Sequence, residues 1–220
     1  MAIITPKNTL NEIITSRPEI IPLINRFGII LGIGDNTVES ICKEKNLDCD
    51  FFTMILNTYL NENFFPEKTL KSFHVKVIIN YISQTYIYYI NYMIPNIERH
   101  FNLLISNSGN NNNLKLMQHF FSELKNDIKE AIEFDIDKWF PSILSSREKH
   151  TKHIANNNYF NNNSIIEDKI NDLKSMFFIH LNGKYDLNLC YAVITAIVAF
   201  EKDFKQNNRI RNRILSPIYT

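Results

Sequence analysis

Histidine is the residue of this chain best suited to metal or acid–base chemistry, and His150 and His153 have the spacing of a metal chelate. Two imidazoles three residues apart lie on one face of a helical turn. Protein zinc sites require further ligands, and no cysteine or carboxylate is suitably spaced to supply one here. We therefore interpret the pair as solvated loop histidines. Three more histidines lie singly on predicted long helices: His74, His100 and His119.

Other chemically capable groups have simpler structural interpretations. The acidic row formed by Glu123, Asp127 and Glu130 is typical of a solvated helix face. The tyrosines between residues 81 and 92 are typical of core or interface packing. The glycine cluster at 28–34 has neither the preceding strand nor the following Lys-Ser/Thr of a phosphate-binding loop, so it predicts a turn.

Charge and cysteine content narrow the class of protein. The 24 basic and 23 acidic residues give a formal charge of +1, which favours neither nucleic acid nor an anionic membrane as a partner. Cys42, Cys49 and Cys190 have unrelated spacings, which indicate neither a disulfide framework nor a zinc site. Unpaired cysteines of this kind are typical of proteins in a reducing compartment. We see no secretory signal at the N-terminus, and the apolar run at 192–200 is too short to span a bilayer. We therefore expect a cytoplasmic protein.

After Pro66 the apolar residues recur with helical period, and we expect an all-α chain. Ile82, Tyr86 and Met93, for example, lie on one stripe of the first segment, which Pro95 should kink. Long helices joined by polar loops favour an antiparallel four-helix bundle, here as a domain at residues 69–217. The four helices are expected at about 69–106, 114–144, 164–181 and 186–215.

Residues 1–62 predict a separate module of short helices. Thr9 is expected to cap the first of them, Asn36 the third and Asp48 the fourth. Gly28 should end the second helix. The expected helices cover about 10–16, 19–27, 36–45 and 48–61.

Four stretches carry a resemblance to a known family: 27–29 with 37–42, 132–134 with 140–141, 166–169, and 200–203 with 214–217. In their order and spacing they resemble the iron-sulfur cluster repair (repair-of-iron-centres) proteins. In that family an N-terminal helical module precedes a hemerythrin-like bundle. The likeness covers roughly residues 8–217. It implies a hemerythrin-like four-helix bundle, two bound iron ions, and a stress-response role in repairing iron-sulfur clusters after nitrosative or oxidative damage.

Almost every position where the family has an iron ligand holds a different residue in this chain. Asp135 alone could still bind iron through a carboxylate, whereas Arg211 is a fixed cation. Gly32 and Ile33 stand where the family has a cysteine pair. We therefore expect no catalytic residue, no metal and no cofactor. The former ligand positions implied by the resemblance are Tyr86, Asn107, Ala131, Asp135, Asn163, Asn207 and Arg211.

Two contacts follow from this substitution. Two carboxylates that once bridged irons would repel each other without the metal, and an arginine in place of one removes the repulsion. We predict a buried ion pair between Asp135 and Arg211, joined by two hydrogen bonds. Tyr86 should point into the bundle, where Asn207 or Asn163 could bind its hydroxyl.

Two functions remain open at this point. The first is a degenerate hemerythrin-like protein that has lost its di-iron centre and acts as a non-catalytic binding or regulatory protein. Its partner would be an unidentified protein or a second copy of the chain. The second is a di-iron protein that repairs iron-sulfur clusters, using ligands other than those aligned above.

Overall fold

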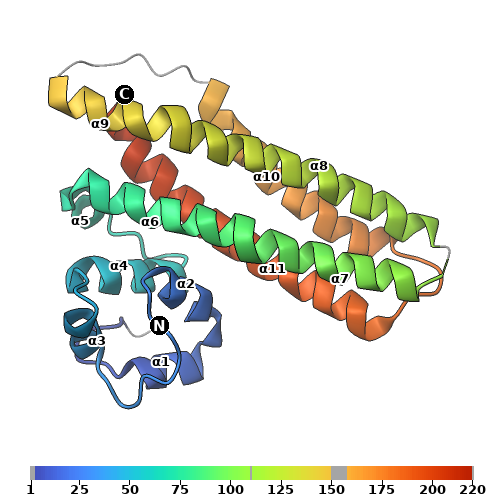
Figure 1. Cartoon of the computed structure of the whole chain (residues 1–220), viewed down its shortest axis with the longest axis horizontal. Helices are drawn as coiled ribbons and strands as arrows, with labels where there is room; N and C mark the ends of the chain where they lie inside the picture. The colour runs from blue at the N-terminus through green and yellow to red at the C-terminus, as the bar shows by residue number, and fades with distance from the viewer. Residues whose placement is uncertain (1–2, 110, 150–157, 220) are drawn as a thin grey trace.

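The structure, a computed structural model, describes residues 3–109, 111–149 and 158–219 (Figure 1). Within these ranges the chain is all-helical, as predicted. They contain no strand, only an isolated antiparallel bridge between Thr9 and Thr37. His150 and His153 lie outside the described residues.

After residue 74, the described residues form four long helical rods. Each contains a π-helical segment, written η, in which one turn holds an extra residue. Rod 1 is α6 (Val75–Tyr88), η2 (Tyr89–Met93) and α7 (Ile94–Asn107); rod 2 is α8 (Asn112–Phe134), η3 (Asp135–Trp139) and α9 (Phe140–Lys149); rod 3 is α10 (Asn158–Ser175) and η4 (Met176–His180); rod 4 is α11 (Leu187–Ile210), η5 (Arg211–Leu215) and α12 (Ser216–Tyr219).

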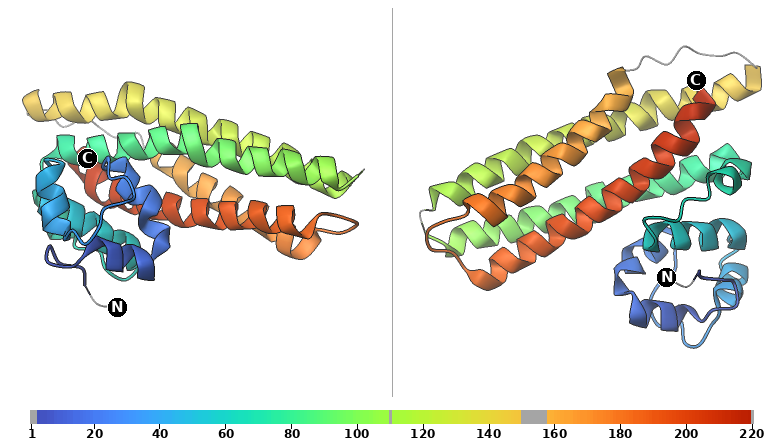
Figure 2. Two further views of the ribbon diagram at one scale, coloured as in Figure 1. Left: turned by 60° about the horizontal axis from the view of Figure 1, so that its bottom comes forward. Right: turned by 180° about the vertical axis from the view of Figure 1, so that it is seen from behind.

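The rods lie side by side, and successive rods run in opposite directions (Figures 1 and 2). Helix α11 packs along α7 and α10, and α10 packs along α8. Each rod buries one apolar stripe, so the core runs along the whole length between them. The arrangement leaves a few inward-facing polar residues, described below, enclosed by apolar neighbours.

Two predicted rod starts were wrong, and rods 2 and 4 end at Lys149 and Tyr219 rather than near residues 144 and 215. Rod 1 begins at Val75 rather than near residue 69, because Glu67–Ser72 forms a separate helix, α5, and the His74 imidazole accepts the Lys76 N–H as a cap. Rod 3 begins at Asn158 rather than near residue 164. Asparagine disfavours helix interiors, but Asn163 is buried and hydrogen-bonded to Asn208 on α11, and this tertiary contact overrides the propensity.

Short helices occupy the N-terminal sixty residues, as the sequence predicted. Asp48 caps α4, but Thr37 rather than Asn36 caps α3. The Thr9 side chain makes no cap hydrogen bond; its backbone instead bridges to Thr37. These helices lie at one end of the rods (Figure 2). They are α1 (Leu10–Ser16), η1 (Pro18–Ile20, a 3₁₀ turn), α2 (Ile21–Arg26), α3 (Val38–Glu44) and α4 (Cys49–Leu60).

Prolines explain the π segments in three rods. A helical proline ring clashes with the carbonyl four residues before it. For Pro95, Pro141 and Pro217 that carbonyl lies inside η2, η3 and η5 respectively. Each of these segments closes with an N–H bonded to the carbonyl five residues earlier. The widened turn lets the rod continue past the proline. At Pro95, where the sequence predicted a kink, the helix contains the π segment η2 and continues as α7.

Asn111 connects the start of rod 2 to the loop before rod 4 through hydrogen bonds of its side chain. Its side-chain oxygen accepts the Asn113 and Leu114 N–H groups, and its amide donates to the carbonyls of Asn182 and Lys184. We expect Asn111→Ala to lower the free energy of unfolding by about 1–2 kcal/mol, measured by urea denaturation. The exposed neighbour variant Asn112→Ala should have the parent's stability. Equal stability of both variants would contradict this role.

Candidate functional site

An ion pair between rods 2 and 4 lies at the centre of the polar interior. Arg211 Nε donates to Asp135 Oδ2 at 2.6 Å, and Nη2 donates to Oδ1 at 2.6 Å. Both side chains are 2% exposed. The two-pronged contact predicted from the sequence is therefore present and buried.

Rod 1 supplies a third donor to the same carboxylate. Tyr86 is buried, and its hydroxyl donates to Asp135 Oδ2 at 2.6 Å. The inward orientation of Tyr86 was predicted correctly, but its expected partner, Asn207 or Asn163, was wrong. A carboxylate accepts a stronger hydrogen bond than a neutral amide, and Asp135 lies within reach of the hydroxyl.

Aromatic rings surround the three polar groups. The Arg211 guanidinium lies over the Trp139 ring, 4.2 Å from its centroid. The Tyr86 ring stacks on Phe140 with centroids 6.1 Å apart. Such rings exclude water while still stabilising a cation, so the charges are held in a medium where an unpaired charge would be costly.

The local backbone explains why these side chains meet. Asp135 and Arg211 are each the first residue of a π segment, η3 and η5. Each is followed six residues later by the proline that the π turn accommodates, Pro141 or Pro217. The prolines therefore fix where the wide turns fall and hence the orientation of both charged side chains. π turns occur frequently at functional sites in proteins.

The electrostatics favour a charged guanidinium and a protonated phenol. Burial by itself lowers the pKa of Arg211, but the hydrogen bonds and negative charge of Asp135 raise it overall. Burial raises the pKa of Tyr86 well above its ordinary value, and the Asp135 charge raises it further. Tyr86 therefore remains a hydrogen-bond donor to the carboxylate.

The other positions that the resemblance aligns with iron ligands do not join this cluster. Asn163 is buried and donates to Asn208 Oδ1 at 3.0 Å. Asn207 lies one turn from Arg211 and is 1% exposed, and neither of its amide atoms has a hydrogen-bond partner among the described residues. Asn107 is exposed at the far end of rod 1, and Ala131 lines a half-exposed groove between α8 and α10. Asn107 therefore faces away from the core, whereas Ala131 is half-buried and packs against it.

A second buried ion pair was not predicted from the sequence. Arg26 of α2 contacts Asp203 of α11, and the two side chains are 1% and 4% exposed. Arg26 also donates to the Thr85 hydroxyl and lies over the Tyr88 ring, 5.0 Å from its centroid. The contact joins the N-terminal helices to rods 1 and 4. Its one sequence signal was the position of Asp203 on the apolar stripe of the fourth segment.

The described histidines are dispersed. His74 caps α6, and His119 is exposed with Nδ1 3.6 Å from a Glu123 oxygen. His100 is half-buried, and its Nδ1 has no hydrogen-bond partner among the described residues. Over ranges 3–109, 111–149 and 158–219, no three His, Cys, Asp or Glu side chains lie close enough together to hold a metal ion.

Comparisons of this chain with protein-family models, with curated proteins and with solved structures found no match. Among the helices of the described residues, none is both long enough and apolar enough to cross a membrane.

We expect Asp135→Ala to lower the free energy of unfolding by about 3–5 kcal/mol, because it leaves the buried Arg211 cation without a counter-ion. The double variant Asp135→Leu/Arg211→Met should recover most of that loss, since it removes both charges. Urea denaturation measures the effect. As a control, Lys71→Met breaks the exposed Lys71–Glu67 pair and should cost no more than about 1 kcal/mol. A stable Asp135→Ala protein would contradict the role of the pair.

Buried tyrosines should make the protein sensitive to alkaline pH. Burial raises the pKa of Tyr86 and of Tyr89, whereas unfolded phenols lose their proton near pH ~10. Above that pH the unfolded state binds fewer protons than the folded state, so the free energy of unfolding falls as pH rises. The expected slope is about 1.4 kcal/mol per pH unit for each such tyrosine. Below that pH these tyrosines are protonated in both states and add no pH dependence. Urea denaturation at increasing pH measures the slope.

Tyr89→Phe gives the cleanest test, because the Tyr89 hydroxyl has no hydrogen-bond partner among the described residues. This variant should flatten the alkaline slope, whereas Tyr191→Phe, at a tyrosine that is 73% exposed, should leave it unchanged. Ultraviolet titration of the folded protein that ionised every tyrosine near pH ~10 would contradict the expectation.

Proposed function

We propose that this chain is a degenerate hemerythrin-like protein in which a buried ion pair has replaced the di-iron centre. The four rods would be its four-helix bundle, and the helices at residues 1–62 its N-terminal module. In this proposal the protein acts as a non-catalytic binding or regulatory protein. The observation that carries the proposal is the two-pronged contact between Asp135 and Arg211, which aligns with carboxylate ligand positions of the family.

The donor groups at these positions do not fit two iron ions. Iron centres of this kind require imidazoles and carboxylates projecting inward from several helices. The Asp135 carboxylate already accepts three hydrogen bonds, two from Arg211 and one from Tyr86. Ala131 offers no ligand atom, and the Asn207 amide is a weak one. We therefore derive no chemical step through a metal in this protein.

The charge balance supports replacement over simple loss. A lone carboxylate in this interior would be strongly destabilising. The Arg211 guanidinium supplies a positive charge and two directed donors at the place where a metal would otherwise neutralise Asp135. Tyr86 fills further volume with a ring and donates a third hydrogen bond to the carboxylate. In such a site each charged group is bonded to another group of the protein.

The proposed binding role is supported by the Asp135–Arg211 site, whose charged groups are bonded to each other and to Tyr86. The cysteines Cys42, Cys49 and Cys190 are free thiols, which supports a cytoplasmic location. The partner would be another protein or a second copy of this chain.

Metal analysis of protein purified from iron-supplemented cells tests the proposal. We expect iron far below one atom per chain and no oxo-bridge absorption band, because the donor set is occupied by protein groups. The double variant Asp135→Leu/Arg211→Met, which removes the pair, serves as the metal-free reference. About two irons per chain together with the absorption band would contradict the proposal and support a di-iron repair protein instead.

A further inference from the structure

An open groove lies where the N-terminal helices meet rods 1 and 4. It consists of two adjoining hollows, of 560 Å³ and 460 Å³, that share Tyr88 and Tyr92. The two tyrosine rings stack on each other with centroids 5.7 Å apart. Tyr88 is half-buried, whereas Tyr92 is 63% exposed. We call this surface the tyrosine groove.

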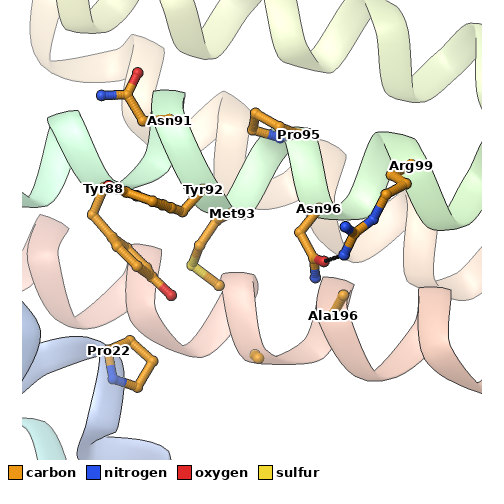
Figure 3. A pocket seen from close by; sticks show the side chains of 10 residues that line it. Pro22, Tyr88, Asn91, Tyr92, Met93, Pro95, Asn96, Arg99 and Ala196 are labelled. Carbon is orange, nitrogen blue, oxygen red and sulfur yellow. Dashed lines mark hydrogen bonds between the residues drawn. The ribbon is translucent and has the colours of Figure 1, made fainter. Parts of the chain in front are cut away.

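Three separate parts of the chain form its walls. Pro22 of α2 closes one side, and Ala196 of α11 lies on the opposite wall from Asn96 (Figure 3). Tyr88 and Met93 extend from rod 1 towards α11 (Figure 3). On the other side of the tyrosine pair, the second hollow is lined by Ile30 and Ile87, which are both exposed. Ligand sites are commonly found where separate structural units meet in this way.

The π segment η2 contains Tyr92 and directly follows Tyr88. Tyr89, its first residue, is buried between rods 1 and 4 against Phe200, with ring centroids 5.2 Å apart. The neighbours Tyr88 and Tyr92 then project together from the rod surface. The segment thus serves packing on one side and presents an aromatic pair on the other.

The groove carries one charge without an opposite charge beside it. Arg26 is buried and paired with Asp203. Arg99 is exposed, and the hydrogen bond from its guanidinium goes to the neutral Asn96 side-chain oxygen at 2.8 Å (Figure 3). Among the described residues Arg99 forms no ion pair. A ligand with a negative charge near Arg99 would therefore be favoured.

We propose that the tyrosine groove binds a proline-rich segment of a partner protein that carries an acidic residue opposite Arg99. Proline-rich segments adopt a preformed polyproline II helix, so they lose little entropy on binding and suit open, aromatic-lined grooves. The hollows on the two sides of the tyrosine pair would each receive a proline ring, and the amides of Asn91 and Asn96 would bind peptide carbonyls. This inference extends the proposed binding role by assigning it a surface.

Binding can be measured by fluorescence anisotropy with fluorescein-labelled proline-rich peptides in which a glutamate is placed at each position in turn. We expect at least one of them to bind with Kd below about 1 mM. The matched peptide with lysine in place of glutamate should bind at least about tenfold more weakly, because its positive charge would repel Arg99. If no glutamate peptide binds in this range, the proposal is overturned.

Variants locate the site. Tyr92→Ala should weaken binding about tenfold or more, because it removes the exposed half of the aromatic pair. Ala199→Trp places a large ring on an exposed position of the groove wall and should block it. The matched variant Val198→Trp, at an exposed position beside a different surface of α11, should bind like the parent. Loss of binding in Val198→Trp but not in Ala199→Trp would overturn the assignment.

A charge reversal separates recognition from simple structural damage. Arg99→Glu should reverse the preference, so that the lysine peptide binds more tightly than the glutamate peptide. Lys184→Glu, an equal charge change at an exposed position outside the groove, should leave the preference unchanged. An unaltered preference in Arg99→Glu would overturn the proposal.

Two further outcomes are distinguishable. If the parent sediments as a dimer and Tyr92→Ala as a monomer, a second copy occupies the groove and the peptide proposal fails. The iron content tests the proposed function independently. Peptide binding by a protein with two irons would refute the loss of the di-iron centre and leave the groove assignment intact.

Discussion

Two opposite charges, Asp135 and Arg211, are joined by two hydrogen bonds in a site that water does not reach, and the arrangement of rods 1, 2 and 4 depends on them. A buried ion pair contributes modest net stability, because desolvation offsets most of the attraction, but separating its members is expensive. Any shift of rod 2 against rod 4 by one residue would separate them. Tyr86 adds the same constraint to rod 1. The cluster therefore specifies register more than it adds stability.

The π segments are the means by which the backbone meets that constraint. In three rods an inward residue precedes a proline by six positions: Tyr89 and Pro95, Asp135 and Pro141, Arg211 and Pro217. Each proline removes a donor and requires room at the preceding turn. The wide turn supplies that room at a fixed point, and so the inner residue is oriented by a covalent feature of the sequence several residues away.

The second ion pair extends the same principle to the N-terminal helices. Arg26 and Asp203 hold α2 against rods 1 and 4, with Tyr88 under the guanidinium. The same tyrosine forms one wall of the surface groove, so the contact that attaches these helices also shapes that surface. Charges in the interior are satisfied by one another, whereas Arg99 on the surface has only a neutral partner. The interior charges are therefore occupied by each other, whereas Arg99 is accessible at the surface.

The sequence by itself determined the features that depend on neighbours along the chain. Apolar periodicity predicted the helical segments. The helix starts at Asp48 and Asp186 were also predictable, because a capping side chain accepts hydrogen bonds from N–H groups only a few residues away, and the structure confirms both. The Asp135–Arg211 pair was also predicted, through the charge argument applied to two aligned positions.

Only the tertiary structure decided the rest. Asp135 rather than an asparagine binds Tyr86, Asn107 is exposed, and Arg26 meets a carboxylate 177 residues away. Helical period fixes which residues share a stripe, but the partner across each interface depends on how the rods are rotated and shifted against one another, and that is set by packing of the whole core.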